Sequence, residues 1–206
     1  MPIIAVVGNK GGAGKTTLSV NLAAGISQHS SIAVIDADPQ GSSLQWRAIA
    51  GDNVHFPVYA PTFSLKHQAE SYVKKNDYVL IDCPPSVKAP QTIDVLEFAD
   101  IALIPVQPSP IDLWSSVHIE KAVIEARETN PDLNAILVIN QLESRTTLSK
   151  LVREVLSEIA LPVADTAIRR RAIYRNSAME GKSVYNVGKR GADAVAELNL
   201  LIKEVI

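Results

Sequence analysis

The chain has 206 residues, of which 47% are hydrophobic and 20% are charged, and its formal net charge is −2. A chain of this size and composition can bury an ordinary core, so we expect a single domain over residues 1–206. It contains no apolar run near the ~20 residues that a membrane span needs, and its only cysteine, Cys83, excludes an internal disulfide and any site built from several thiolates. We expect a cytoplasmic protein in which Cys83 is a small buried residue.

Short β-branched runs alternate with amphipathic stretches along most of the chain. The runs predict buried strands at Ile3–Val7, Ile32–Ile35, Val79–Ile81, Ile101–Ile104 and Ala135–Ile139. Apolar residues at three- and four-residue spacing predict helices at Lys15–Gln28, Ser42–Ile49, Leu65–Lys74, Gln91–Phe98, Ser115–Glu128, Thr146–Ile159 and Ala192–Val205, with an irregular region at Arg169–Arg190. This order predicts an α/β fold with a doubly wound, mostly parallel sheet. In such sheets ligands bind beyond the carboxyl ends of the strands.

The loop after the first predicted strand, GNKGGAGKTT from Gly8 to Thr17, has the pattern of a phosphate-binding P-loop. Glycines let successive backbone N–H groups point at a phosphate, and the helix that follows adds a favourable dipole. We expect the amine of Lys15 to reach the β- and γ-phosphates and the hydroxyl of Thr16 to coordinate Mg²⁺. Asn9 replaces the usual first glycine, which makes the loop a deviant version. The predicted phosphate contacts are Gly11, Gly12, Ala13, Gly14, Lys15, Thr16 and Thr17.

Carboxylates follow two of the other predicted strands, in DADPQ from Asp36 and in DCPP from Asp82. A carboxylate after a buried strand is the partner that a P-loop needs to hold Mg²⁺, and we assign that role to Asp82. A second carboxylate near the γ-phosphate can orient the attacking water and touch the metal, and Asp38 is the candidate. Either aspartate can instead cap the turn or helix that follows it.

The motifs NKGGAGKTT, VIDADPQGS, VLIDCPPS, LIPVQPSP and AMEGKSVY together resemble the ParA/MinD family of deviant Walker A ATPases. They extend over nearly the whole chain, and its small size resembles the short plasmid-partition branch that includes ParF-like proteins. The resemblance implies a P-loop NTPase fold, with ATP and Mg²⁺ as cofactors. It also implies slow ATP hydrolysis that a partner protein stimulates, and a role in moving plasmids, chromosomes or other cargo.

The resemblance also explains the second lysine of the loop, Lys10. In this family the lysine at that position crosses a dimer interface to the phosphates held by the other subunit, so ATP acts as the switch for homodimer formation. The implied catalytic group is therefore Lys10, Lys15 and Asp38. For the nucleotide base the family pattern suggests Asn140 and the loop 167–171.

Positive charge gathers late in the chain. Residues 145–190, called here the basic segment, contain ten basic and four acidic residues, a balance of +6, so the rest of the chain carries −8. Such a surface attracts nucleic acid phosphates without reading sequence. Related partition ATPases bind nonspecific DNA as ATP dimers, which would place this protein on the nucleoid; the alternative is a solvated face with internal ion pairs. The candidate DNA contacts are Arg169, Arg170, Arg171, Arg175, Lys182, Lys189 and Arg190.

Several alternatives stay open from sequence. Membrane attachment, as in MinD-like proteins, needs a basic amphipathic tail, whereas Ala192–Ile206 has one lysine and three acidic residues. We expect no membrane partner, and we expect Leu198, Leu201, Ile202 and Val205 to pack against the domain. The favoured function is plasmid segregation through a centromere-binding adaptor; the alternatives are positioning of a protein cargo such as carboxysomes through its own adaptor, a small-molecule synthetase on the same fold, and a scaffold that binds nucleotide without turnover.

Overall fold

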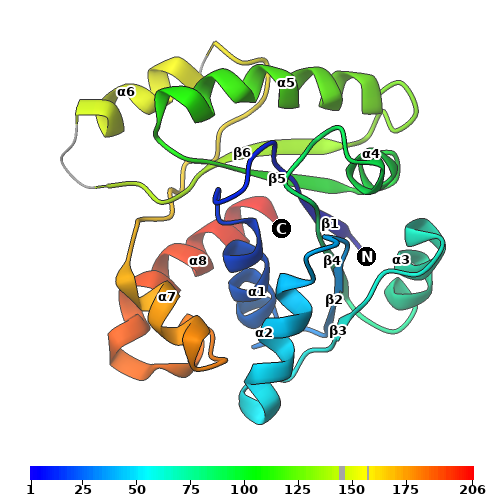
Figure 1. The fold of residues 1–206 in the computed structure, drawn as a ribbon, viewed down its shortest axis with the longest axis vertical. Coiled ribbons are helices and arrows are strands. Elements are labelled where there is room, and N and C mark those ends of the chain that lie inside the picture. Colours follow the sequence, from blue (N-terminus) through cyan, green and yellow to red (C-terminus); the bar gives the residue numbers. More distant parts are fainter. Residues whose placement is uncertain (144–146, 157) are drawn as a thin grey trace.

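One parallel sheet lies at the centre of the molecule in a computed structural model that describes residues 1–143, 147–156 and 158–206, with the backbone alone for 110–116 and 147–151. Its strand order is β3-β2-β4-β1-β5-β6, and every neighbouring pair is parallel (Figure 1). The strands are β1 (Ile3–Val6), β2 (Ile32–Asp36), β3 (Val58–Tyr59), β4 (Tyr78–Asp82), β5 (Ile101–Val106) and β6 (Asn134–Ile139). The predicted fold class is confirmed.

Helices cover both faces of this sheet. The face that carries β1 residues Ile3 and Ala5 packs against α3 (Leu65–Val73), α4 (Pro90–Leu96), α5 (Pro110–Ala126) and α6 (Thr147–Leu156). The opposite face, with Ile4 and Val6, packs against α1 (Lys15–Ile26), α2 (Ser42–Ala50), α7 (Ala172–Met179) and α8 (Ala192–Val205). Three short 3₁₀ turns, η1 (Gly51–Asn53), η2 (Val184–Asn186) and η3 (Gly188–Gly191), complete the described elements.

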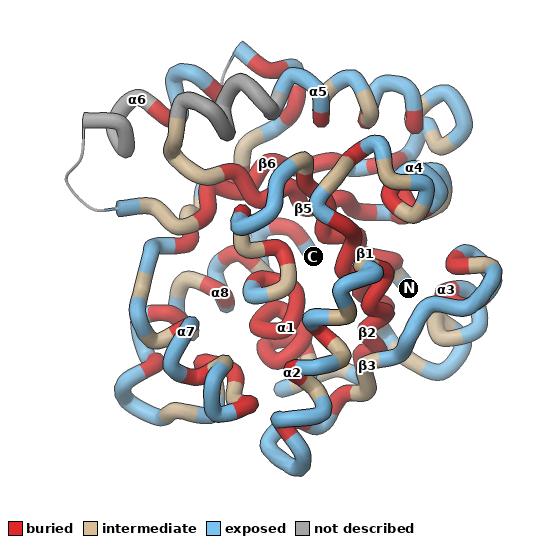
Figure 2. The backbone as a smooth tube through the Cα atoms, in the orientation of Figure 1, coloured by how far each residue is buried: buried red, intermediate tan, exposed pale blue. Residues whose placement is uncertain are grey.

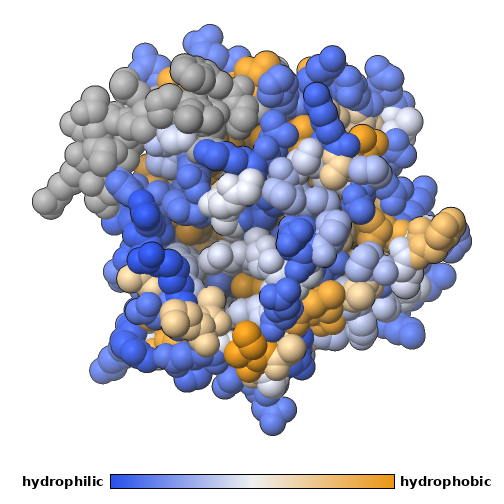
Figure 3. Space-filling model, in the orientation of Figure 1, coloured by the Kyte–Doolittle hydropathy of each residue, from blue (hydrophilic) through white to orange (hydrophobic). Residues whose placement is uncertain are grey.

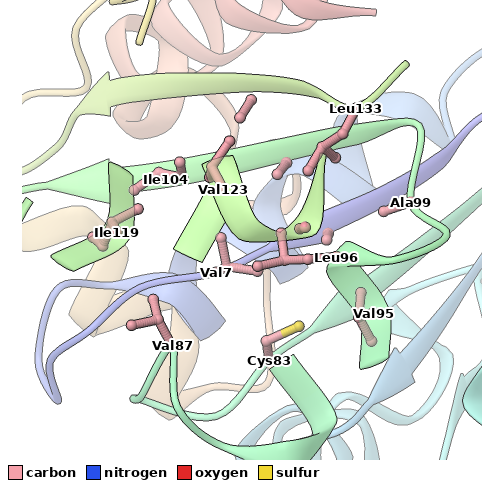
Figure 4. Close-up of a cluster of buried hydrophobic side chains, with 14 of the residues drawn as sticks. Val7, Cys83, Val87, Val95, Leu96, Ala99, Ile104, Ile119, Val123 and Leu133 are labelled. Carbon is pink, nitrogen blue, oxygen red and sulfur yellow. The ribbon is translucent and has the colours of Figure 1, made fainter. Parts of the chain in front are cut away.

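The core is formed where alternate residues of each strand enter one of two apolar layers. Figure 2 shows the strands and the inner side of α1 as the most buried parts of the chain. Figure 4 shows the layer beneath α4 and α5, where Cys83 lies among Val7, Val95 and Leu96. Cys83 is fully buried, as predicted, and burial raises the pKa of its thiol.

Three elements differ from the sequence-based expectation. The helix α5 begins at Pro110, five residues before the predicted Ser115, because a helix tolerates proline in its first turn. The two-residue strand β3 was not predicted, because a run this short has no detectable alternation. The region expected to be irregular at Arg169–Arg190 contains the helix α7, which buries only Tyr174 and Ser177. A helix that buries so few residues shows little hydrophobic periodicity in its sequence. The charged residues of this region therefore hid the helical pattern.

The C-terminal helix α8 packs against the domain, as predicted, and its neighbour there is α1. Leu198, Leu201 and Val205 are buried in the layer on that face, and Ile202 packs against it. Among the described residues, no helix has the length and apolar character needed to cross a bilayer.

Leu198→Ala should destabilise the protein by about 3 kcal/mol, since a cavity would replace a fully buried side chain. Leu200→Ala, on the exposed side of the same helix, is the matched control and should change the free energy of unfolding by less than about 0.5 kcal/mol. Denaturant unfolding measures both. Equal effects of the two variants would contradict the packing of α8 described above.

Candidate nucleotide-binding site

The P-loop joins β1 to α1 at the point where the strand order reverses, because β1 lies between β4 and β5. Gly12 (φ 82°) and Gly14 (φ 88°) adopt left-handed backbone conformations that favour glycine. Gly14 is the N-cap of α1, and no side chain caps the first turn of that helix. The loop therefore presents backbone N–H donors at a helix N-terminus, an arrangement suited to a phosphate.

Lys15 is buried at the base of this loop, with 6% of its surface exposed. Its amine donates a hydrogen bond to the carbonyl oxygen of Lys10 over 3.1 Å. Burial lowers the pKa of Lys15, and the negative charges of Asp82 and Asp38 oppose that shift. Lys10 itself is exposed at the surface. One lysine of the loop is thus buried, and the other is accessible to solvent.

Asp82 ends β4 on the sheet face covered by α1 and α2. The Ser19 hydroxyl donates to Oδ1 over 3.1 Å, and the Ser43 hydroxyl donates to Oδ2 over 2.6 Å. Burial raises the pKa of Asp82 to about 6, although the hydrogen bonds from Ser43, Thr16 and Ser19 act against the shift. Asp82 and Thr16 therefore share one hydrogen-bonded site at the carboxyl end of β4; their role as magnesium ligands stays a prediction.

These oxygen ligands fit Mg²⁺, which prefers hard oxygen donors and is held by few protein groups beside the phosphates. Among the described residues there is no cluster of three or more His, Cys, Asp or Glu side chains that would hold a metal ion alone. Thr16 and Asp82 would hold the ion together with a bound nucleotide, and the ion would neutralise phosphate charge there.

Two hydrogen-bond donors to Asp82, Ser19 and Ser43, were missed from sequence. Ser19 lies three residues after Thr16, on the same side of α1, so the spacing could have indicated it. Ser43 had no such signal, and Asp36, which the sequence places after a predicted strand, was given no role. Asp36 pairs in register with Asp82 and accepts the backbone N–H of Leu44 over 2.9 Å, and burial raises its pKa.

Asp38 is half-buried in the loop between β2 and α2. Its carboxylate accepts the backbone N–H of Gln40 over 3.0 Å, which is the turn-capping contact that the sequence left open. The carboxylate is also close enough to Lys15 to influence its pKa. A role in orienting water or touching the metal stays a prediction for Asp38.

A cavity of about 180 Å³ opens beside the P-loop, and Gly14 and Thr17 form part of its lining. Asn140 and the loop 167–171, which the family pattern suggested for the nucleotide base, both contribute to it. Its lining consists of Gly14, Thr17, Leu18, Asn140, Gln141, Ile168, Arg169, Arg170, Arg171, Ala172, Tyr174, Arg175 and Leu198. We call this space the base cavity; base binding there stays a prediction.

The consecutive arginines of the basic segment form ion pairs with acidic side chains. Arg171 contacts Glu197 over 2.6 Å and Asp193 over 3.0 Å, Arg169 lies 3.7 Å from Glu197, and Arg170 pairs with Glu143. Lys182 pairs with Glu180 over 2.8 Å.

By contrast, Arg175, Lys189 and Arg190 form no ion pair with any part of the chain that the structure describes. Figure 3 shows strongly hydrophilic residues over the segment that leads into α7, and a mixture of hydrophilic and more apolar residues over α7 itself. The predicted DNA contacts thus divide into paired and unpaired groups.

Three side-chain amides that sequence reasoning did not place in this role hold the P-loop from outside. Gln107 and Gln141 both donate to the Gly12 carbonyl oxygen, over 2.6 and 3.0 Å, and Asn140 donates to the Ala13 carbonyl oxygen over 2.8 Å. A side chain at Gly14 would lie 2.5 Å from the Asn140 amide nitrogen and would displace that amide, and the backbone there (φ 88°) is strained for any residue but glycine.

The family model of the CobQ/CobB/MinD/ParA nucleotide-binding domain matches residues 4–184. The chain belongs to this family. The match confirms the predicted ParA/MinD resemblance and P-loop fold and, at the level of the family, an ATPase that uses ATP and Mg²⁺. It extends from β1 to the start of η2, so the P-loop, both strand-end aspartates and all of the lining of the base cavity except Leu198 lie within it.

Among curated relatives, this CobQ/CobB/MinD/ParA member is 38% identical to Maintenance of carboxysome distribution protein A of Halothiobacillus neapolitanus, over 98% of this chain and 95% of that protein. It is 28% identical to the sporulation initiation inhibitor protein Soj of Bacillus subtilis, over 95% of this chain and 96% of that protein.

Among solved structures, apo McdA from Cyanothece covers 100% of this chain and 99% of that chain with a TM-score of 0.79 at 19% identity. At that level of identity the likeness supports the fold alone.

The raised pKa of Asp82 predicts a titration that NMR can follow. In nucleotide-free protein the Asp82 carboxyl carbon should titrate near pH 6, and Mg²⁺ with ADP should lower the midpoint, since a divalent cation favours the carboxylate. Because the pKa of Asp82 is higher in the folded than in the unfolded protein, its contribution to the free energy of unfolding is most favourable below about pH 4, where the group is protonated in both states. That contribution is lost as the pH rises through 6. A midpoint near the ordinary value of about 4 would contradict the buried site.

Proposed function

We propose that this protein is an ATP-driven positioning ATPase whose cargo is a protein body of the carboxysome class. The observation that carries the proposal is the 38% identity to a carboxysome distribution protein over 98% of the chain. A second such protein, from Gloeobacter kilaueensis, is 27% identical over 98% of this chain. Relatives named for chromosome partitioning match at 25–26%, so plasmid segregation, favoured from sequence, is the less specific assignment.

The switch in this proposal is an ATP-bound homodimer. Lys10 is exposed to solvent, where a second subunit could reach it, whereas Lys15 is buried at the base of the loop and would hold phosphates bound to its own chain. A γ-phosphate between two such loops would be stabilised by an ammonium from each subunit. ATP hydrolysis would remove that charge and release the dimer, and an adaptor on the cargo would time it.

Nonspecific DNA on the nucleoid is the proposed surface over which the cargo is distributed. Arg175, Lys189 and Arg190 are the better candidates for DNA contact, because the arginines at 169–171 already neutralise acidic side chains of the same chain. One such small patch binds phosphates weakly, and two patches joined in a dimer bind far more tightly. DNA binding would therefore follow the ATP state.

Deletion of the gene in its host tests the cargo. Carboxysomes marked with a fluorescent shell protein should collapse from an even distribution into a few clusters, while plasmid and chromosome inheritance stay normal. Reintroducing the wild-type gene should restore the distribution, and Lys15→Ala should not, because it removes the phosphate-binding amine. Plasmid loss with evenly spaced carboxysomes would assign the protein to partition instead.

Two variants separate dimerisation from DNA contact in purified protein. Lys10→Gln should bind ATP yet stay monomeric in light scattering, and it should lose DNA retention as a consequence. Lys189→Glu with Arg190→Glu should dimerise normally and lose at least about tenfold in DNA affinity, with a weaker salt dependence than wild type. A stable ATP dimer of Lys10→Gln would contradict the proposed role of Lys10. Undiminished retention by the double variant would place the DNA face elsewhere.

A further inference from the structure

The amides of Gln107 and Gln141 converge on one backbone carbonyl of the P-loop, that of Gly12. Gln107 follows β5 and Gln141 follows β6, so two different strand ends reach the same peptide group. A carbonyl oxygen has two lone pairs, and here two side-chain donors occupy them. The neighbouring carbonyl, of Ala13, receives the Asn140 amide in the same way.

The backbone at Gln141 supports a specific role for this contact. Gln141 has φ 56° and is the only non-glycine residue among those described with a left-handed conformation. That conformation is uncommon for a residue with a side chain and is found most often where surrounding contacts impose it. Here it accompanies a hydrogen bond from the side chain back onto the P-loop.

Holding a carbonyl also fixes the N–H of the same peptide group. A trans peptide is planar, so its C=O and N–H point in opposite directions. With the Gly12 oxygen held by Gln107 and Gln141, the N–H of Ala13 points away from both glutamines. With the Ala13 oxygen held by Asn140, the direction of the Gly14 N–H is fixed likewise.

We propose that Gln107 and Gln141 are positioning residues that aim the Ala13 N–H at the phosphates of the bound nucleotide. The proposal rests on the nucleotide-binding part of the proposed function and assigns to these side chains the pre-organisation of the loop. Without them the Gly12–Ala13 peptide is free to rotate, since both glycines that flank Ala13 permit many conformations. Phosphate binding then includes the entropic cost of ordering that peptide.

The test replaces each amide by a group of the same size that cannot donate. Gln107→Glu, Gln141→Glu and the double variant place a carboxylate against the Gly12 carbonyl. Gln28→Glu is the matched control, because Gln28 also donates to a backbone carbonyl, that of Ala24 over 3.0 Å, at the far end of α1. Gln141→Asn is the uncharged control: Asn accepts the left-handed backbone, but its shorter side chain falls short of Gly12.

ADP is the probe, because it requires neither dimerisation nor hydrolysis. The double variant should bind ADP at least about tenfold more weakly than Gln28→Glu, with each single variant between them. The Ala13 amide resonance in ¹H–¹⁵N spectra should shift on ADP binding in wild type and shift much less in the double variant. Without nucleotide, the double variant should unfold at the same midpoint as Gln28→Glu. If the two glutamines only stabilised the fold, the midpoint of the double variant would be lower.

Two results would overturn the proposal. Equal ADP affinity in wild type and the double variant, with the Ala13 shift retained, would refute the positioning role and leave the proposed function intact. Absence of ADP binding by wild-type protein would overturn both together. If the double variant does not fold, the two Gln→Glu single variants and Gln141→Asn decide by the same comparison, since each leaves one donor on the Gly12 carbonyl.

Discussion

The buried opposite charges of Lys15 and Asp82 are the constraint on which the rest of the site depends. Burial disfavours both ions, as the lowered pKa of the lysine and the raised pKa of the carboxyl show. Removing two charges from water costs more than their mutual attraction returns unless other groups complete the site. A magnesium nucleotide supplies what is missing, phosphate charge for the amine and a cation for the carboxylate. The free protein therefore holds a destabilised site, and ligand binding relieves it.

The same carboxylate ties two helices to the metal position. Ser19 connects it to α1 and Ser43 connects it to α2, so both helix N-termini meet at one pair of oxygen atoms. Asp38 lies on the loop between β2 and α2, and Asp36 in turn accepts the backbone N–H groups of Asp38 and Leu44. A change in charge at Asp82, on binding or loss of the metal, would thus reach the loop that carries Asp38. That loop is the part of the site best placed to convert nucleotide state into a change of shape.

Sequence was sufficient where a feature depends on neighbours along the chain, and it was insufficient where the fold brings distant residues together. The buried strands, the P-loop and Asp82 could be predicted because each is a local pattern with a local cause. Gln107 and Gln141 could not, because they lie 95 and 129 residues from Gly12, and nothing near either glutamine indicates a partner. The arginines at 169–171 show the same limit: the triplet is conspicuous in sequence, yet the acidic partner that two of them share, Glu197, lies 26 residues beyond Arg171.

The ion pairs of the arginine triplet change what the charge of the basic segment can do. Arg171 joins the base cavity to α8 through a partly buried ion pair with Glu197. Breaking such a pair destabilises a protein far more than breaking a surface pair does. Those arginines therefore fix the wall of the cavity, and among the candidate DNA contacts the charge left for a partner comes from Arg175, Lys189 and Arg190. Three cations release few counterions and give weak binding at physiological salt. In the proposed dimer a second copy would double that number, which is a physical reason to expect the proposed nucleic acid binding to depend on the dimer.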